Sequence, residues 1–272
     1  VRRFEQLKQD INTYENNLGF LSISSKKGNN LIDDMNRRVQ KLKDELEEIK
    51  QKIKIWKVKG NEKMVNLTLE EKVAKALFDV KAVKINVGEP FTFASGIKSP
   101  IYCDNRYVLG FSDERDTIVE AFVERIDKNV DVIVGVATAG IPWAAFIADR
   151  MKKPLAYVRN KPKDHGAGKQ IEGAEVKGKK VVVIEDLITT GKSSLIAVDV
   201  LQKEEVKELE VKSIFSYGFD SAKKNYAKYN CKFSSLSNFD VLIKLLAQTD
   251  YLTQDEAKIA LEWSKNPEKW GR

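Results

Sequence analysis

The stretch that decides the fold runs from residue 179 to residue 201 and reads KKVVVIEDLITTGKSSLIAVDVL. It opens with an unbroken apolar run at positions 181 to 184, which predicts a short strand buried on both faces. Apolar residues at 195, 198 and 201 then recur at helical spacing. Two acids and a hydroxyl-rich turn, residues 189 to 194, separate the two patterns. The stretch therefore predicts a strand–loop–helix unit.

The turn of this unit is predicted to bind an anion. Backbone N–H groups of the loop and the positive end of the helix dipole converge there, and both favour a phosphate. Glu185 and Asp186 stand at the entrance to this site, where they would repel a triphosphate unless they bind something else. Carboxylates can accept hydrogen bonds from ribose hydroxyl groups. The combination therefore suits a sugar phosphate.

Two other interpretations of the same stretch need to be weighed. Gly191-Lys192-Ser193 ends like an ATP-binding P-loop, but that motif needs a glycine five positions before Gly191, where this chain has Asp186. The simpler alternative is an ordinary strand-to-helix turn whose threonine and serine side chains only cap the helix. The acid pair beside a run of hydroxyl and glycine positions favours the ligand site over that alternative.

Length and composition bound the class of protein. The 272 residues suffice for one large domain or two smaller ones, and a hydrophobic content of 42% can supply a core. The formal charge of +7 is spread along the chain, so we expect a solvated surface rather than a nucleic-acid site. Cys103 and Cys231 have no metal-ligand spacing and are expected to be free thiols in a reducing compartment. With neither a signal peptide nor a membrane-length apolar run, we expect a cytoplasmic protein that makes no membrane contact.

Residues 1–57 differ in pattern from the rest. Two apolar runs, within residues 4–18 and 31–56, step by three and four among charged residues, which is the coiled-coil pattern. A polar loop between them predicts an antiparallel helical hairpin, expected to be an appended piece with no part in the chemistry. Its alternative role is an arm for oligomerisation or partner binding. Residues 58–63 form a polar linker, and residues 64–272 are expected to form the catalytic domain.

The catalytic domain repeats the strand–helix alternation. Residues 131–136 predict a buried strand, followed by a loop of small residues and a helix, and residues 155–158 predict another strand. This alternation predicts an α/β fold, a doubly wound parallel sheet with its ligand at the carboxyl ends of the strands. Residues 159–172 contain cations and glycines with almost no apolar side chain, which predicts a solvated loop.

The segment EDLITTGKS resembles the phosphoribosyl-pyrophosphate (PRPP) motif of type I phosphoribosyltransferases. Its sequence is most similar to the form of the motif in the orotate phosphoribosyltransferase family. The segment FTFASGIKSP, residues 91–100, resembles that family's hood over the pyrimidine. The resemblance implies transfer of phosphoribose from PRPP to orotate, giving orotidine 5′-monophosphate and pyrophosphate. It implies that PRPP is bound by Arg159, Lys163, His165, Glu185, Asp186, Leu187, Ile188, Thr189, Thr190, Gly191, Lys192 and Ser193.

The same resemblance assigns the remaining roles. It implies catalytic roles for Lys163, His165, Glu185 and Asp186, and a pyrophosphate loop made of Ala137, Thr138, Ala139 and Gly140. Orotate would contact Phe91, Ser95, Gly96 and Thr189. The resemblance also implies Mg²⁺ held mainly by substrate and water, without a protein metal cluster. It implies a homodimer in which the loop carrying Lys163 and His165 closes over PRPP in the partner subunit.

The chain departs from the family pattern at three places. Ala139 and Asn160 each stand where some members have lysine, and residues 221–223 read Ser-Ala-Lys where some members have an orotate-binding arginine. Two alternatives therefore stay open. One is a type I phosphoribosyltransferase that uses another base, and the other is a regulator that senses PRPP without catalysis.

Overall fold

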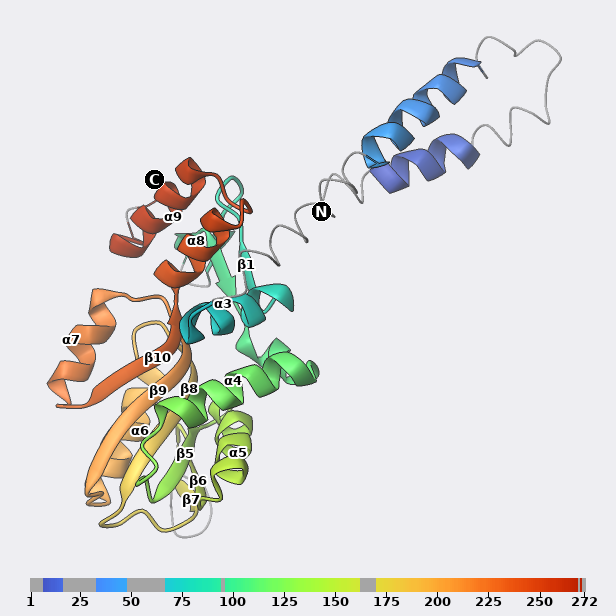
Figure 1. The fold of residues 1–272 in the computed structure, drawn as a ribbon. Helices are drawn as coiled ribbons and strands as arrows, with labels where there is room; N and C mark the ends of the chain where they lie inside the picture. Colours follow the sequence, from blue (N-terminus) through green and yellow to red (C-terminus); the bar gives the residue numbers. More distant parts are fainter. Residues whose placement is uncertain are drawn as a thin grey trace. The chain divides into compact units, whose positions relative to one another are not determined.

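The computed structural model describes residues 7–16, 33–47, 67–93, 96–161, 170–268 and 270. The chain divides into two compact units, Val1–Asn66 and Leu67–Arg272. The second unit contains the elements α3 to α9 and β1 to β10 (Figure 1). In the described part of the chain, no helix combines the length and the apolar character that a membrane crossing needs.

The first unit contains two helices, residues 7–16 and 33–47, which lie side by side (Figure 1). Leu7 and Ile11 of the first helix and Met35 and Val39 of the second are buried. An ion pair of 2.7 Å between Lys43 and Glu15 joins the two helices. Both apolar runs in this unit therefore contain helices, as their spacing predicted. Some of the other apolar positions of the two runs lie outside the described residues.

A six-stranded sheet forms the centre of the second unit. Its strand order is β10-β9-β8-β5-β6-β7, and every pairing is parallel except β6 with β7. The strands are β5 (Val132–Val136), β6 (Leu155–Val158), β7 (Ile171–Gly173), β8 (Lys180–Ile188), β9 (Glu208–Ser216) and β10 (Lys232–Asn238). The predicted doubly wound parallel sheet is confirmed, with the short antiparallel strand β7 added at one edge.

Helices cover both faces of this sheet because side chains of the central strand alternate between two cores. Val182 and Ile184 of β8 belong to one core, and Val181 and Val183 belong to the other. The first core contains residues of α3 (Leu69–Asp79), α4 (Ser112–Arg125), α5 (Gly140–Met151), α8 (Phe239–Gln248) and α9 (Gln254–Lys265). The second contains residues of α6 (Lys192–Lys203) and α7 (Asp220–Lys228).

The segment before α4 forms small antiparallel pairs of strands. Strand β1 (Val83–Ile85) pairs with β4 (Ile101–Cys103), and β2 (Phe91–Thr92) pairs with β3 (Lys98–Ser99). A 3₁₀ helix, η1 (Asn105–Gly110), follows β4. The β2–β3 hairpin is attached to α9, because Nε1 of Trp263 donates to the carbonyl of Lys98 at 3.0 Å. Phe93 of this segment also packs edge-on against Trp263, with ring centroids 6.4 Å apart.

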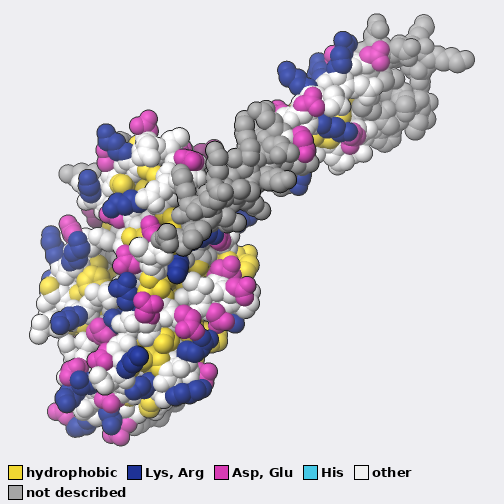
Figure 2. All heavy atoms as spheres, viewed as in Figure 1, with side chains coloured by type: hydrophobic (Ala, Val, Ile, Leu, Met, Phe, Trp, Pro, Cys, Tyr) yellow, Lys and Arg dark blue, Asp and Glu magenta, His cyan; other side chains and the backbone are white. Residues whose placement is uncertain are grey.

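Charged side chains are mixed over the surface. On the face that Figure 2 shows, Lys and Arg side chains alternate with Asp and Glu side chains over the second unit, without a large area of one sign. Several oppositely charged pairs are in contact, among them Lys180 with Glu208 at 3.0 Å. The positive formal charge is therefore dispersed on this face.

Candidate functional site

The acid pair lies at the point where the strand order of the sheet reverses direction. The chain passes from β5 to β6 on one side and later returns to β8 on the other side of β5. Crevices at such a switch point, outside the carboxyl ends of the strands, are where open α/β sheets bind ligands. Glu185 and Asp186 lie within the carboxyl end of β8, and residues 137–139 follow the adjacent end of β5. The sequence placed the acids after a shorter strand, but they are part of the strand itself.

Glu185 is almost fully buried, with 4% of its surface exposed. Its two carboxylate oxygens accept hydrogen bonds from the Ser193 hydroxyl at 2.9 Å and from the Asp186 backbone N–H at 3.1 Å. Burial, followed by the negative charge of Asp186, raises the pKa of Glu185 to about 8. Near neutral pH, Glu185 is therefore mostly protonated in the free protein.

Asp186 is partly exposed, and its backbone is held by a residue far away in the sequence. The Asn105 side-chain amide donates to the carbonyl of Asp186 at 2.7 Å, and the Cys103 thiol donates to the Asn105 side-chain oxygen at 3.1 Å. Burial, then the charges of Asp186 and Asp104, raises the pKa of Cys103 well above its usual range, so this thiol stays protonated. Sequence analysis missed Asn105, which is 1% exposed, because its partner Asp186 lies 81 positions away and no local pattern marks the contact.

The predicted phosphate loop, residues 189–193, turns from β8 into α6. Gly191 is the N-cap of α6 with φ = 78°, a left-handed conformation that glycine adopts at little cost. No side chain caps this helix, so its first-turn N–H groups, at Lys192 and Ser193, are free to face a ligand. Thr189 and Thr190 are accessible, whereas Ile188 is 1% exposed and can offer a ligand only backbone groups. Leu187, which was also predicted to contact PRPP, is partly buried.

A second helix N-terminus lies beside the first. Ala137, Thr138 and Ala139 connect β5 to α5, and Gly140, expected in the loop, is the first residue of α5. A side chain at Gly140 would collide with the carbonyl oxygen of Ile184 in β8, so glycine permits this close approach. Two helix N-termini and one acid pair thus meet at the carboxyl ends of the central strands. This arrangement suits a ligand that has a polar centre and a phosphate-containing group at each end.

The predicted base-binding segment lies at the same side of the sheet. Phe91 is in β2 and packs 5.9 Å from the Tyr102 ring, while Gly96 lies in the turn between β2 and β3 with φ = 82°. Ser95 lies outside the described residues. Phe93 stacks on Tyr217, with ring centroids 6.3 Å apart. The Tyr217 backbone N–H donates to the carbonyl of Ile188 at 3.2 Å, so the segment reaches the end of β8 that carries the acid pair. Burial raises the pKa of Tyr217, with smaller contributions from charges that include Asp186.

Arg159 lies at the base of the predicted closing loop. Its backbone N–H donates to the carbonyl of Gln170 at 2.9 Å, and the Gln170 side chain donates back to the Arg159 carbonyl at 3.1 Å. These bonds join the end of β6 to the start of β7. Lys163 and His165, expected to reach the substrate, lie outside the described residues.

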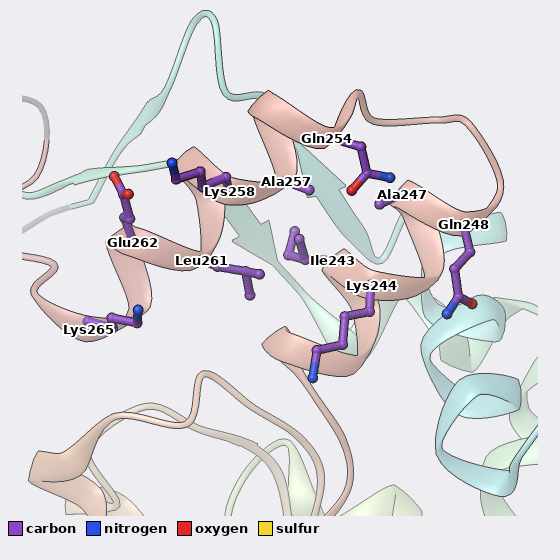
Figure 3. Close-up of a pocket in the computed structure, with 10 residues that line it drawn as sticks. All are labelled: Ile243, Lys244, Ala247, Gln248, Gln254, Ala257, Lys258, Leu261, Glu262 and Lys265. Atoms are coloured by element: carbon purple, nitrogen blue, oxygen red, sulfur yellow. The ribbon is translucent and has the colours of Figure 1, made fainter.

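Hollows elsewhere on the unit are not lined by the acid pair. One of about 590 Å³ lies at the carboxyl ends of β9 and β10, where Tyr217, Phe219 and Lys223 contribute to its walls. Another of about 470 Å³ lies between α8 and α9, where Ile243 and Leu261 face one another and Lys258 and Lys265 lie at its rim (Figure 3). None of the ten residues lining this second hollow is a predicted site residue. Among the described residues, no group of three or more His, Cys, Asp or Glu side chains could hold a metal ion.

Comparison with known proteins identifies the family of the chain. The family model of the phosphoribosyl transferase domain matches residues 113–244. An orotate phosphoribosyltransferase of Listeria innocua is 49% identical over 209 residues, which cover 76% of this chain and 100% of the relative. One from Fusobacterium nucleatum is 49% identical over 203 residues, covering 73% of this chain and 96% of the relative.

A solved structure supports the same assignment. The crystal structure of orotate phosphoribosyltransferase from Aeropyrum pernix has a TM-score of 0.55 and 28% sequence identity, and the match covers 65% of this chain and 98% of that one. Sequence motif, sheet topology and full-length relatives agree. This chain belongs to the orotate phosphoribosyltransferase family.

Proposed function

We propose that this protein transfers the phosphoribosyl group from PRPP to orotate, forming orotidine 5′-monophosphate and releasing pyrophosphate. The observation that carries the proposal is the meeting of Glu185 and Asp186 with the N-termini of α5 and α6 at the switch point of the sheet. The relatives that match along nearly their whole length are named orotate phosphoribosyltransferases. The hairpin beside Tyr217 supplies the aromatic wall that a flat base needs.

We assign the phosphate groups to the two helix N-termini. The 5′-phosphate would bind the loop of residues 189–193 through backbone N–H groups and hydroxyls. The pyrophosphate would bind the loop of residues 137–140 mainly through main-chain groups, because Ala139 offers no side-chain donor. Arg159, Lys163 and His165 would add positive charge as the leaving group becomes more negative.

The acid pair is assigned to the ribose. Asp186, partly exposed, would accept a hydrogen bond from one ribose hydroxyl and stabilise the positive charge that develops at the anomeric carbon. Protonated Glu185 keeps the Ser193 side chain and the Asp186 backbone in place and would contact the second hydroxyl. Thr189 and the segment carrying Phe91, Ser95 and Gly96 would orient orotate for attack.

The residues present fit a magnesium ion that is bound largely through the substrate. Asp186 is an accessible carboxylate of the kind that Mg²⁺ accepts, and Mg²⁺ usually keeps several waters and binds substrate phosphates. The absence of a dense acidic cluster among the described residues is compatible with that mode. When bound, the ion would neutralise charge on the pyrophosphate.

We further propose that the protein acts as a cytoplasmic homodimer whose closing loop reaches the partner's PRPP. Free thiols at Cys103 and Cys231 support a reducing compartment. The proposed domains are a coiled-coil hairpin at 1–57, a linker at 58–63 and the catalytic domain at 64–272. Two observations support them: the second compact unit starts at Leu67, and the Listeria relative leaves about a quarter of this chain unmatched.

The direct test is the fall in orotate absorbance after PRPP and Mg²⁺ are added. We expect a loss that requires both additions, that EDTA prevents and that purine bases do not reproduce. Pyrophosphate release with another base and none with orotate would keep the reaction type and refute the substrate. Binding of PRPP without turnover of any base would favour a PRPP-sensing regulator.

A further inference from the structure

Two residues of helix α7, Asn225 and Tyr226, contact the phosphate loop. Tyr226 of α7 is 1% exposed and stacks on Phe233 of β10, with ring centroids 4.1 Å apart and planes 16° apart. The same ring also contacts Gly191, since a methyl group added at Gly191 would stand 2.6 Å from a Tyr226 ring carbon. The tyrosine ring thus contacts both the sheet and the loop.

A chain of two hydroxyl groups connects Tyr226 to the backbone of the loop. The Ser194 hydroxyl lies 2.6 Å from the Tyr226 hydroxyl and donates to the carbonyl of Gly191 at 3.1 Å. A serine hydroxyl has one proton, so Tyr226 must donate to Ser194 while Ser194 donates to Gly191. Ser194 is fully buried, which makes these bonds stronger than exposed ones.

The residue before Tyr226 holds the preceding carbonyl. The Asn225 side-chain amide donates to the carbonyl of Thr190 at 3.1 Å. Two successive residues of α7 thus act on two successive carbonyl groups of the loop. Asn225 binds the Thr190 carbonyl directly, and Tyr226 is linked to the Gly191 carbonyl through Ser194.

This arrangement fixes the direction of two backbone N–H groups. Both peptides are trans, because Ala137–Thr138 is the cis peptide that the described residues contain. In a trans peptide the N–H points opposite to the C=O of the same plane. Asn225 holds the carbonyl of Thr190 toward α7, which turns the N–H of Gly191 away from α7. The carbonyl of Gly191 points along α6, where it accepts from the Leu195 N–H at 2.9 Å as well as from Ser194, and this turns the N–H of Lys192 out of the helix N-terminus. Lys192 is the first residue of α6, where N–H groups have no acceptor within the helix.

We propose that Asn225 and Tyr226 are positioning residues for substrate, which orient the N–H groups of Gly191 and Lys192 toward the 5′-phosphate of the sugar phosphate. This inference rests on the proposed function, and it adds two residues of α7 to a site otherwise built from β5, β8, α5 and α6. A loop whose donors are fixed before binding loses less entropy when the phosphate arrives. Asn225 and Tyr226 would therefore increase the affinity for the phosphate and would take no part in the chemical step.

The test compares Tyr226→Phe and Asn225→Ala with the wild type, and Tyr229→Phe serves as the matched control. Tyr229 is the C-cap of the same helix, and its hydroxyl loss leaves the loop contacts in place. Binding of ribose 5-phosphate is measured by calorimetry, because this probe has the 5′-phosphate and no pyrophosphate. The KM for PRPP, the KM for orotate and kcat are measured in parallel, with the thermal midpoint as a check on folding.

We expect each of the two variants to bind ribose 5-phosphate about fivefold more weakly, the effect of one net hydrogen bond. The KM for PRPP should rise by the same factor, while kcat and the KM for orotate stay at wild-type values and Tyr229→Phe behaves as wild type. Unchanged ribose 5-phosphate binding in both variants would overturn the inference. So would a fall in kcat with the KM for PRPP unchanged, which indicates loss of folded protein only.

Three further outcomes remain, and each of them has a defined meaning for the inference. If Tyr226→Phe does not fold, Asn225→Ala decides, because its partly exposed side chain can be truncated without opening the core. If the wild type binds ribose 5-phosphate but consumes no orotate, the proposed function fails while the affinity ratio still decides this inference. A wild type that does not bind ribose 5-phosphate overturns the inference itself.

Discussion

Replacing Glu185 with glutamine should change how the stability of the protein depends on pH. The folded protein holds this side chain at a pKa of about 8, against an ordinary value of 4.5. Between these two values the unfolded chain ionises Glu185 and the folded chain does not, so the free energy of unfolding falls as pH rises. Glutamine is neutral at every pH; its side-chain oxygen can accept from the Asp186 N–H, and its amide group can donate to the Ser193 hydroxyl oxygen. The Glu185→Gln variant should therefore lack this pH dependence.

The size of the effect follows from the shift. Each pKa unit corresponds to about 1.4 kcal/mol, so the full shift corresponds to roughly 5 kcal/mol. Below pH 4.5 the carboxyl group is protonated in both states and adds no pH dependence. From there to pH 8, the stability of Glu185→Gln relative to wild type should rise by up to about 5 kcal/mol and then level off.

The assay is urea unfolding of both proteins without ligand at pH 5, 6, 7, 8 and 9. The quantity compared is the difference in unfolding free energy between variant and wild type at each pH, which cancels the titration of groups that do not interact with Glu185. A difference that stays flat from pH 5 to pH 8 would refute the assignment of a buried, protonated Glu185. A decrease with pH would show that the carboxylate is stabilised in its ionised form.

Three further predictions concern the loop, its support and the first unit. Gly191→Ala should lower the free energy of unfolding by at least about 1–2 kcal/mol, because alanine resists the left-handed conformation and meets the Tyr226 ring; urea unfolding with PRPP-binding calorimetry checks this. Asn105→Ala should leave the Asp186 carbonyl without its donor, cost about 1–3 kcal/mol in unfolding free energy and lower kcat; wild-type kinetics would contradict the role given to Asn105. A chain that starts at Met64 should keep the kcat and both KM values of the full chain; a tenfold loss in kcat would give the helical hairpin a part in catalysis.

The sequence indicates the elements whose patterns are local. The apolar runs at 132–136 and 155–158 predict β5 and β6, and the helical spacing at 195–201 predicts α6. Strand β10 was not predicted because its sequence KFSSLSN has no apolar run. It forms through pairing with β9, where the Ser213 and Ser235 hydroxyls lie 2.7 Å apart. Helix α8, which follows it directly at Phe239, was missed with it.

The boundaries of the site depend on contacts that local patterns do not contain. Strand β8 continues through the acid pair to Ile188 because Leu187 and Ile188 pair with Phe215 and Ser216 of β9. The bond from Asn105 to Asp186 spans 81 positions, and the one from Asn225 to Thr190 spans 35. The motif therefore predicts which residues meet the ligand, but the residues that hold them in place emerge only from the fold.

One measurement tests the central claim most directly, because it links the reaction to the acid pair. Wild type and Asp186→Asn are incubated with orotate, PRPP and Mg²⁺, and orotidine 5′-monophosphate is quantified, with thermal unfolding confirming that both proteins are folded. We predict that the wild type converts orotate and that the folded Asp186→Asn variant loses most of this turnover. Equal product formation by the two proteins would contradict the site, and no product from the wild type would contradict the function.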